Sequence, residues 1–117
     1  MRTIITCFGL GILVISSANA VETVKVFILA GQSNMEGKAQ NKLLEHQATD
    51  PKTAKLFSHL RKDRKWITRE DVHIKYLKRH GGLTMGYGSP NRTGVELEFG
   101  HVMGNHFKEP VLLIKTC

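Results

Sequence analysis

The sequence has 117 residues, which is enough for one small domain at most and excludes a protein of several domains. It contains 17 lysine and arginine residues against 10 aspartate and glutamate residues, so the net charge is +7 and the isoelectric point is near 9.7. It carries neither internal repeats nor a low-complexity tail.

Residues 1–20 (MRTIITCFGLGILVISSANA) have the pattern of a secretory signal peptide. Arg2 precedes an apolar stretch over 4–15, and residues 18–20 supply the small-x-small cleavage signal. The alternative is a membrane anchor, but the apolar stretch is short for a spanning helix, which needs about 20 residues. We therefore expect cleavage after Ala20 and a secreted or periplasmic protein without a stable membrane anchor.

The mature chain, 21–117, would keep one cysteine, Cys117. Since a disulfide needs two cysteines, we expect a fold that does not depend on an internal one.

The run at 23–30 (TVKVFILA) predicts the first strand of the domain. It is apolar almost throughout after Lys25 and ends at Gly31, which is typical of a strand buried on both faces in a parallel sheet. The run at 109–116 (EPVLLIKT) predicts a second strand of the same kind.

The connection between these strands has structure of its own. Residues 51–62 predict a short helix with Pro51 in its first turn, and 65–68 predicts a short strand. The segment 71–77 predicts another strand, because apolar and polar residues alternate along it. Residues 80–94 are rich in glycine and predict a loop, which contains an N-glycosylation sequon at Asn91.

Two basic runs, 61–69 and 75–80, concentrate the positive charge. Such runs can bind nucleic acid or an anionic polymer. An acidic residue interrupts the first run, and an exported protein rarely meets nucleic acid, so we expect solvated, charged hairpins and no nucleic-acid partner. The charge still suits an acidic polysaccharide.

Residues 94–107 (GVELEFGHVMGNHF) predict an amphipathic helix. Its apolar row consists of Val95, Phe99, Met103 and Phe107, joined by Val102. Gly100 and Gly104 lower helix propensity, so we expect them to allow close approach to a neighbouring element.

The order strand, helix, strand predicts a right-handed β-α-β crossover. A parallel sheet needs both faces covered, and the sequence stops directly after an apolar strand. We therefore expect residues 21–117 to be the N-terminal part of a larger α/β domain.

The segment FILAGQSNMEGKA, 27–39, begins like two known chemistries. A phosphate-binding loop is excluded by count, because five residues separate Gly31 from Gly37 and Ala39 stands where a hydroxyl should hold magnesium. The Gly-x-Ser-x-Gly elbow of hydrolases fails at Met35.

Ser33 nevertheless follows the carboxyl end of a strand, which is the usual active edge of an α/β sheet. If a helix begins at Ser33 or Asn34, its free N–H groups can hold an oxyanion. The alternative is that Ser33 only caps a helix, and spacing alone does not decide between them.

The residues from Gly31 to Met35 (GQSNM) resemble the nucleophile block of the SGNH-hydrolase superfamily. Within it they resemble the branch of sialate O-acetylesterases and the carbohydrate esterases of family six, in which this serine is the nucleophile. The resemblance implies a three-layer α/β/α, flavodoxin-like parallel sheet. It also implies that Ser33 attacks the substrate.

The segment 94–104 (GVELEFGHVMG) resembles the second block of that family, whose glycine N–H joins the oxyanion hole. Gly94 takes this role by resemblance, and Val95 replaces the usual proline. The family's Asp-x-x-His, which supplies the base, lies further on and is not in this sequence. The six histidines offer no substitute by pattern, so we expect each to be a surface or structural residue.

The resemblance implies an exported serine esterase that removes O-acetyl groups from a sugar, such as a sialic acid or xylan, without metal or cofactor. Ser33 and Gly94 would be catalytic, and Gln32, Asn34 and Glu96 would contact substrate. Alone, this chain would be inactive for want of a base. The alternative is a non-catalytic or vestigial secreted module that binds carbohydrate.

Overall fold

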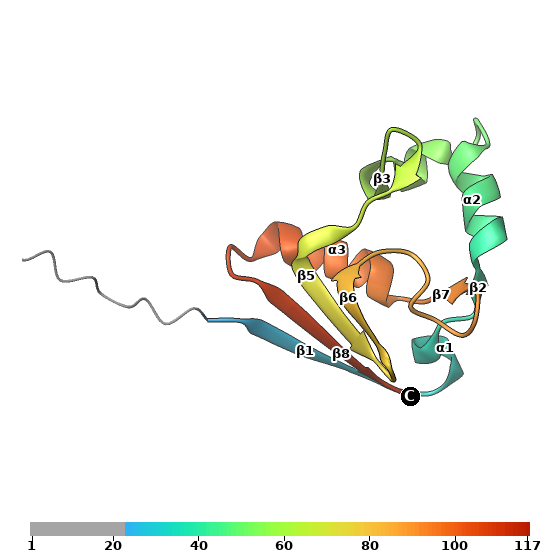
Figure 1. Ribbon diagram of the computed structural model, residues 1–117. Helices are drawn as coiled ribbons and strands as arrows, with labels where there is room; N and C mark the ends of the chain where they lie inside the picture. Colours follow the sequence, from blue (N-terminus) through green and yellow to red (C-terminus); the bar gives the residue numbers. More distant parts are fainter. Residues whose placement is uncertain (1–22) are drawn as a thin grey trace, which may run out of the picture.

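The computed structural model describes residues 23–117, and the predicted signal peptide, 1–20, lies outside the described residues. The chain folds as an α/β domain around one four-stranded sheet with strand order β1-β8-β5-β6 (Figure 1). Within residues 23–117 no helix is long and apolar enough to cross a membrane.

The two predicted apolar strands are confirmed as β1, Lys25–Ala30, and β8, Val111–Thr116. They are parallel neighbours, with Phe27 opposite Leu113. β8 is also parallel to β5, Arg69–Tyr76, so three strands end at one edge of the sheet. In Figure 1 the C-terminus and α1, Ser33–Glu36, lie together at this edge.

The predicted helix is confirmed as α3, Glu96–His106. It packs on the face of the sheet that carries Val72, Ile74 and Leu113, which are almost fully buried. A Cβ on Gly104 would lie 2.5 Å from Val72 Cγ2, and one on Gly100 would overlap the Leu83 side chain. Both glycines therefore allow the close approach that the sequence indicated.

Two residues of the predicted apolar row are not in the core. Val95 and Val102 are both 48% exposed, while Leu97 and His101 are buried. Phe99, Met103 and Phe107 do pack against the core. The buried side of α3 is therefore rotated from the predicted row. Gly100 and Gly104 lie directly against the sheet, because glycine has no side chain to hold the helix away from it.

The expectation that the first strand is buried on both faces is wrong. β1 lies at the edge of the sheet, and its side chains at Val26 and Ile28 are 52% and 69% exposed. Within residues 23–117, α3 covers the other face, which carries Leu29, so this part of the chain shows the sheet and one of the two helical layers expected.

The connection between β1 and β8 differs from prediction at several points. The structure has α2 at Asn41–Thr49, which was not predicted, and a 3₁₀ helix, η1, at Ala54–Leu60 in place of a helix over 51–62. Pro51 lies in the turn between them. The two short helices contact each other and stand away from the sheet (Figure 1).

Both basic runs form hairpins, as expected. β3, Arg61–Lys62, pairs with β4, Lys65–Trp66, across a two-residue turn whose residues Asp63 and Arg64 have φ of 51° and 64°. Positive φ at both positions is the turn geometry that matches the twist of a hairpin.

The second basic run joins β5 to β6, Arg79–Leu83. The predicted alternation of β5 is confirmed, since Val72, Ile74 and Tyr76 are buried while His73 and Lys75 are exposed. The predicted loop over 80–94 is wrong in its first part, because β5 offers β6 a partner strand. A Cβ on Gly82 would lie 2.6 Å from the Arg69 carbonyl oxygen, so glycine suits this pairing. β7, Arg92–Thr93, ends the same segment.

Candidate functional site

Ser33 lies in the turn that follows β1. The helix α1 begins at Ser33 and its N-cap is Gln32, which makes no side-chain capping bond. The expectation of a helix beginning at Ser33 is therefore confirmed, and the alternative that Ser33 only caps a helix is wrong. Gln32, Ser33 and Asn34 are all exposed at the carboxyl edge of the sheet.

Gly37 ends this short helix and directs the chain toward α3. Its φ is 94°, a conformation that glycine adopts without strain, and its N–H donates to the Ser33 carbonyl at 3.1 Å. Directly after it, β2, Ala39–Gln40, pairs antiparallel with β7. The segment after Ser33 is thereby fixed to the segment before Gly94.

Gly37 and Gly94 are in close backbone contact. A Cβ on Gly37 would lie 2.5 Å from the Gly94 nitrogen, and a Cβ on Gly94 would lie 2.7 Å from the Gly37 Cα. Only glycine at both positions permits this approach. The structure therefore brings the turn that carries Ser33 and the start of α3 together, although they are about sixty residues apart in the sequence.

The buried side chain of Lys115 connects the turn of Ser33 to the start of α3. Its side chain is fully buried, and its ammonium group donates three hydrogen bonds. They reach the Glu36 carbonyl at 2.6 Å, the Tyr87 carbonyl at 2.9 Å and Glu96 Oε2 at 2.8 Å. An ammonium group has three donors, so its hydrogen-bonding capacity is satisfied. One lysine thus connects β8 to the end of α1, to the loop before β7 and to α3.

Glu96, predicted to contact substrate, is completely buried. Its second oxygen, Oε1, accepts the Gly94 N–H at 2.8 Å. Gly94 is the residue expected to stabilise an oxyanion, and in this structure its N–H is directed at Glu96. The position of Glu96 is that of a residue that orients Gly94 from beneath the surface.

A second set of hydrogen-bonded side chains, those of Glu36, Lys38 and Ser89, lies beside the turn that carries Ser33. Ser89 donates to Glu36 Oε1 at 2.7 Å, and Lys38 donates to the Ser89 hydroxyl at 2.8 Å and to Glu36 Oε2. The hydrogen bond from Lys38, followed by that from Ser89, lowers the pKa of Glu36 from its ordinary value. The Ser89 N–H also donates to the Gly37 carbonyl at 3.2 Å. Glu36 is thus held as a carboxylate three residues after Ser33.

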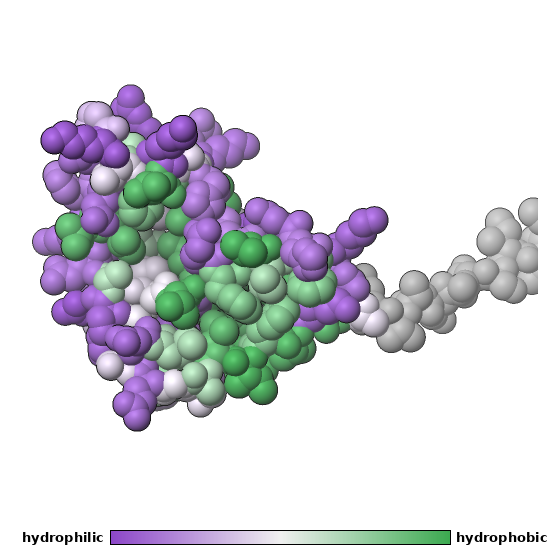
Figure 2. Space-filling view, turned by 180° about the vertical axis from the view of Figure 1, so that it is seen from behind, coloured by the Kyte–Doolittle hydropathy of each residue, from purple (hydrophilic) through white to green (hydrophobic). Residues whose placement is uncertain are grey.

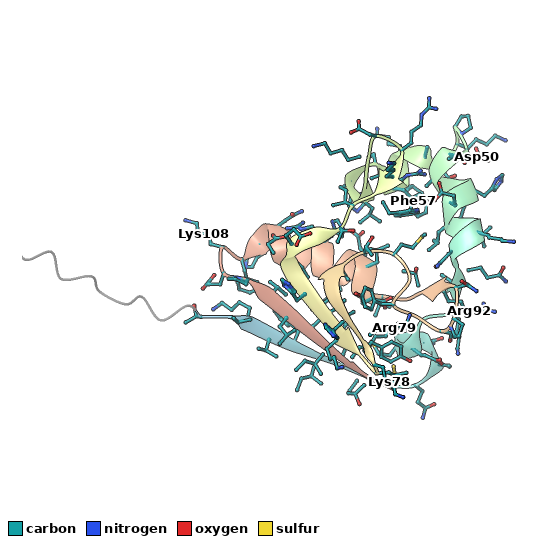
Figure 3. The ribbon with its side chains drawn as sticks, viewed as in Figure 1. Asp50, Phe57, Lys78, Arg79, Arg92 and Lys108 are labelled. Atoms are coloured by element: carbon teal, nitrogen blue, oxygen red, sulfur yellow. The ribbon has the colours of Figure 1, made fainter. Side chains whose placement is uncertain are left out.

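The loop 84–91 is fixed by Arg79, which is labelled in Figure 3. Its guanidinium group donates to the carbonyls of Gly86 at 2.6 Å and Gly88 at 2.5 Å. The Thr93 hydroxyl accepts the Gly86 N–H and donates to Asn41 Oδ1 at 2.8 Å. A hollow of about 370 Å³ opens beside this loop and is lined by residues that include Glu36, Tyr76 and Ser89.

The histidines lie elsewhere in the described part of the chain. His59 Nε2 pairs with Glu98 Oε2 at 2.7 Å, and His101 is buried on α3. Burial, followed by the charge of Arg69, lowers the pKa of His101. Neither imidazole is hydrogen-bonded to Ser33, which agrees with the expectation that they are surface or structural residues.

Sequence reasoning named Ser33 and Gly94 as candidates, but it did not name Lys115, Gly37 or Ser89, which are bonded or packed around them in the structure. A signal for Lys115 was present, because a lysine occupies the inward position two residues after Leu113 in an otherwise apolar strand. Its partners Glu36, Tyr87 and Glu96 lie 79, 28 and 19 residues away, so no local pattern names them.

Three parallel strands end at one edge of the sheet, and the turn of Ser33 at that edge is packed against Gly94, which precedes α3. This is the edge at which α/β proteins usually place their functional sites. A family model described as "Carbohydrate esterase, sialic acid-specific acetylesterase" matches residues 23–117. The chain belongs to this family, which confirms the resemblance seen in the sequence. No match was found among curated proteins or among solved structures.

Proposed function

We propose that this chain carries the nucleophile half of an exported serine esterase that removes O-acetyl groups from carbohydrate. The observation that carries the proposal is the contact between Gly37 and Gly94, which places the turn of Ser33 beside the start of α3. The family match supports the carbohydrate ester as the substrate class.

In the proposed reaction the Ser33 hydroxyl attacks the acetyl carbonyl carbon, and a base accepts its proton. The carbonyl oxygen becomes an oxyanion that the N–H groups of Ser33 and Gly94 stabilise. The C–O bond to the sugar then breaks, and the sugar oxygen takes the proton back. Water hydrolyses the acetyl-serine to acetate and restores Ser33.

This mechanism needs a free Gly94 N–H to stabilise the oxyanion and a base to accept the proton of Ser33. The Gly94 N–H donates to Glu96 in this structure. To stabilise the oxyanion, this N–H must either donate to both oxygens or give up its hydrogen bond to Glu96. The Asp-x-x-His pattern is not among the 117 residues, so the proposal assigns catalysis to a protein that carries it together with this sequence. Gln32 and Asn34 are exposed next to Ser33 and are proposed substrate contacts, while Glu96 is proposed to orient Gly94.

The test is covalent labelling of the full-length protein with a fluorophosphonate, read by peptide mass spectrometry, together with turnover of p-nitrophenyl acetate. We expect an adduct on Ser33 and loss of both signals in Ser33→Ala. Ser58→Ala is the matched control, because Ser58 is exposed on η1 and its hydroxyl only contacts the Lys55 carbonyl. Unaltered turnover in Ser33→Ala rejects the proposal.

One observation favours the alternative, a non-catalytic module that binds carbohydrate. The 117-residue sequence carries a net charge of +7, which suits an acidic polysaccharide. Such a module would give no fluorophosphonate adduct. It would be retained on an acidic polysaccharide at low salt and released as salt is raised.

Export is proposed from residues 1–20, whose pattern also implies removal of that segment. Intact-mass measurement of the protein recovered outside the cell tests this. A mature chain that begins at Val21 supports export with cleavage, and a chain that retains Met1 in the membrane fraction contradicts it.

A further inference from the structure

A second hollow, of about 290 Å³, is lined in part by Gly94. It lies where α2, η1 and the start of α3 meet. Its walls are mostly apolar, and they include Leu44, Phe57, Leu60 and Leu97. In Figure 3 the labelled Phe57 lies on η1, in the part of the molecule that η1 shares with α2.

The rim of this hollow exposes apolar side chains. Leu56 is 69% exposed and Val95 is 48% exposed, and both line the hollow. Seen from behind, the molecule shows hydrophobic residues gathered into continuous areas between hydrophilic ones (Figure 2). Exposed apolar surface that surrounds a concave site is typical of a place where an apolar group binds.

The size of the hollow limits the group that fits. An apolar cavity of about 150 Å³ binds benzene, and sites for larger ligands begin near 300 Å³. The hollow next to Gly94 therefore accepts one aromatic ring with a short substituent. Charged groups are confined to its edge, where Glu98 pairs with His59.

We propose that this hollow is a binding subsite for a single aromatic ring, which an O-acetylated carbohydrate ligand would carry as a substituent. Gly94 lines the hollow and also contacts Gly37, which ends the turn of Ser33. A ligand whose ring enters the hollow would extend past Gly94 toward Ser33. The assignment of the ring to an ester rests on the proposed function, whereas the binding of the ring does not.

Trp66 provides an optical probe for occupancy. It is the only tryptophan, and its ring lies 6.2 Å from that of Phe57 in an edge-to-face arrangement. Since Phe57 lines the hollow, a bound ring that shifts Phe57 also changes the surroundings of Trp66.

The experiment titrates the full chain with N-benzylacetamide, a non-hydrolysable analogue of benzyl acetate, and follows Trp66 fluorescence and backbone amide shifts by NMR. N-methylacetamide, which has the same amide but no ring, is the control ligand. We expect saturable shifts at Phe57, Val95 and Leu97 with the ring only. Ser33→Ala should bind equally well, so a failure of the proposed chemistry leaves this result unaffected.

Leu56→Asp should weaken binding about fivefold, because losing a few tens of Å² of apolar contact at about 25 cal/mol per Å² is worth roughly this factor. Leu43→Asp is the matched control, since Leu43 is 52% exposed on α2 and lies outside the hollow. The proposal is overturned if no saturable shift occurs, if both ligands give the same shifts, if the two variants weaken binding equally, or if the shifts gather at Val26 and Ile28.

Discussion

Lys115 Nζ lies 2.8 Å from Glu96 Oε2, and both side chains are fully excluded from solvent. The pair joins the last strand of the sheet to the first turn of α3. Through its other hydrogen bonds it reaches the end of α1 and the Gly94 N–H. The positions of the two proposed catalytic segments therefore depend on one buried ion pair.

Lys115→Met should lower the free energy of unfolding by about 3–5 kcal/mol, because it leaves the Glu96 carboxylate buried without its partner. Urea denaturation followed by Trp66 fluorescence measures this change. The double variant Lys115→Met with Glu96→Gln should recover much of the loss, since the amide is neutral and its oxygen still accepts the Gly94 N–H. Equal losses in the single and double variants would show that the ion pair is not the source of the effect.

Gly37→Ala should destabilise the protein for two reasons. The alanine would hold an unfavourable φ of 94°, which costs roughly 1–3 kcal/mol, and its Cβ would overlap the Gly94 backbone. Gly86→Ala is the matched control, because Gly86 has a φ of 110° but the nearest atom to its Cβ, on Asn41, is 3.7 Å away. The difference in unfolding free energy between the two variants isolates the contact with Gly94.

In labelling experiments, Gly37→Ala should also slow the reaction of Ser33 with fluorophosphonate, while Gly86→Ala should react at the original rate. Identical labelling rates in both variants would mean that the approach of Gly37 to Gly94 does not set the reactivity of Ser33.

The sequence was sufficient to predict those elements whose pattern is local. β5 was predicted from the alternation of Val72, Ile74 and Tyr76, and it is buried on the predicted side. Ser33 and Gly94 were named as candidates because the residues around each resemble blocks of a known family. Their physical connection through Gly37 was not predicted, since a glycine in the sequence does not indicate which distant backbone segment it approaches.

Other errors arose where tertiary context outweighs composition. β6 forms from a glycine-rich segment because β5 supplies its hydrogen-bonding partner. β1 has the composition of a strand covered on both faces, yet Ile28 is exposed because, within residues 23–117, α3 packs only on the opposite face of the sheet. α2 was missed because its segment is largely polar, with Ala48 its one buried residue.

His101 should make the stability of the fold depend on pH. Its imidazole is buried with Nε2 unpaired, and burial lowers its pKa below the ordinary value of 6.5. The unfolded chain therefore binds this proton more readily, so stability is fully present above about pH 6.5 and falls as pH decreases toward the folded-state pKa. Arg69 opposes the charged form and Glu98 favours it, and the first effect is the larger.

Thermal unfolding at pH 7.5 and 5.5 measures this dependence. His101→Met should reduce the fall in melting temperature between the two values, because methionine fills a similar space without titrating. His73→Met is the control, since His73 is exposed on β5. An unchanged pH dependence in His101→Met would exclude His101 as its source.

The exposed face of β1 should promote self-association of the chain. Val26 and Ile28 are 52% and 69% exposed on an edge strand, which also presents unpaired backbone groups. Ile28→Thr should leave the free energy of unfolding within about 0.5 kcal/mol, because the side chain is already in solvent. It should also shift the chain toward the monomer in sedimentation velocity at raised concentration. Leu77→Asn is the control, because Leu77 is 67% exposed in the turn between β5 and β6 and asparagine tolerates its φ of 54°; it should leave the association unchanged. A monomeric parent chain at all concentrations, or an equal shift in both variants, would contradict a role for this face.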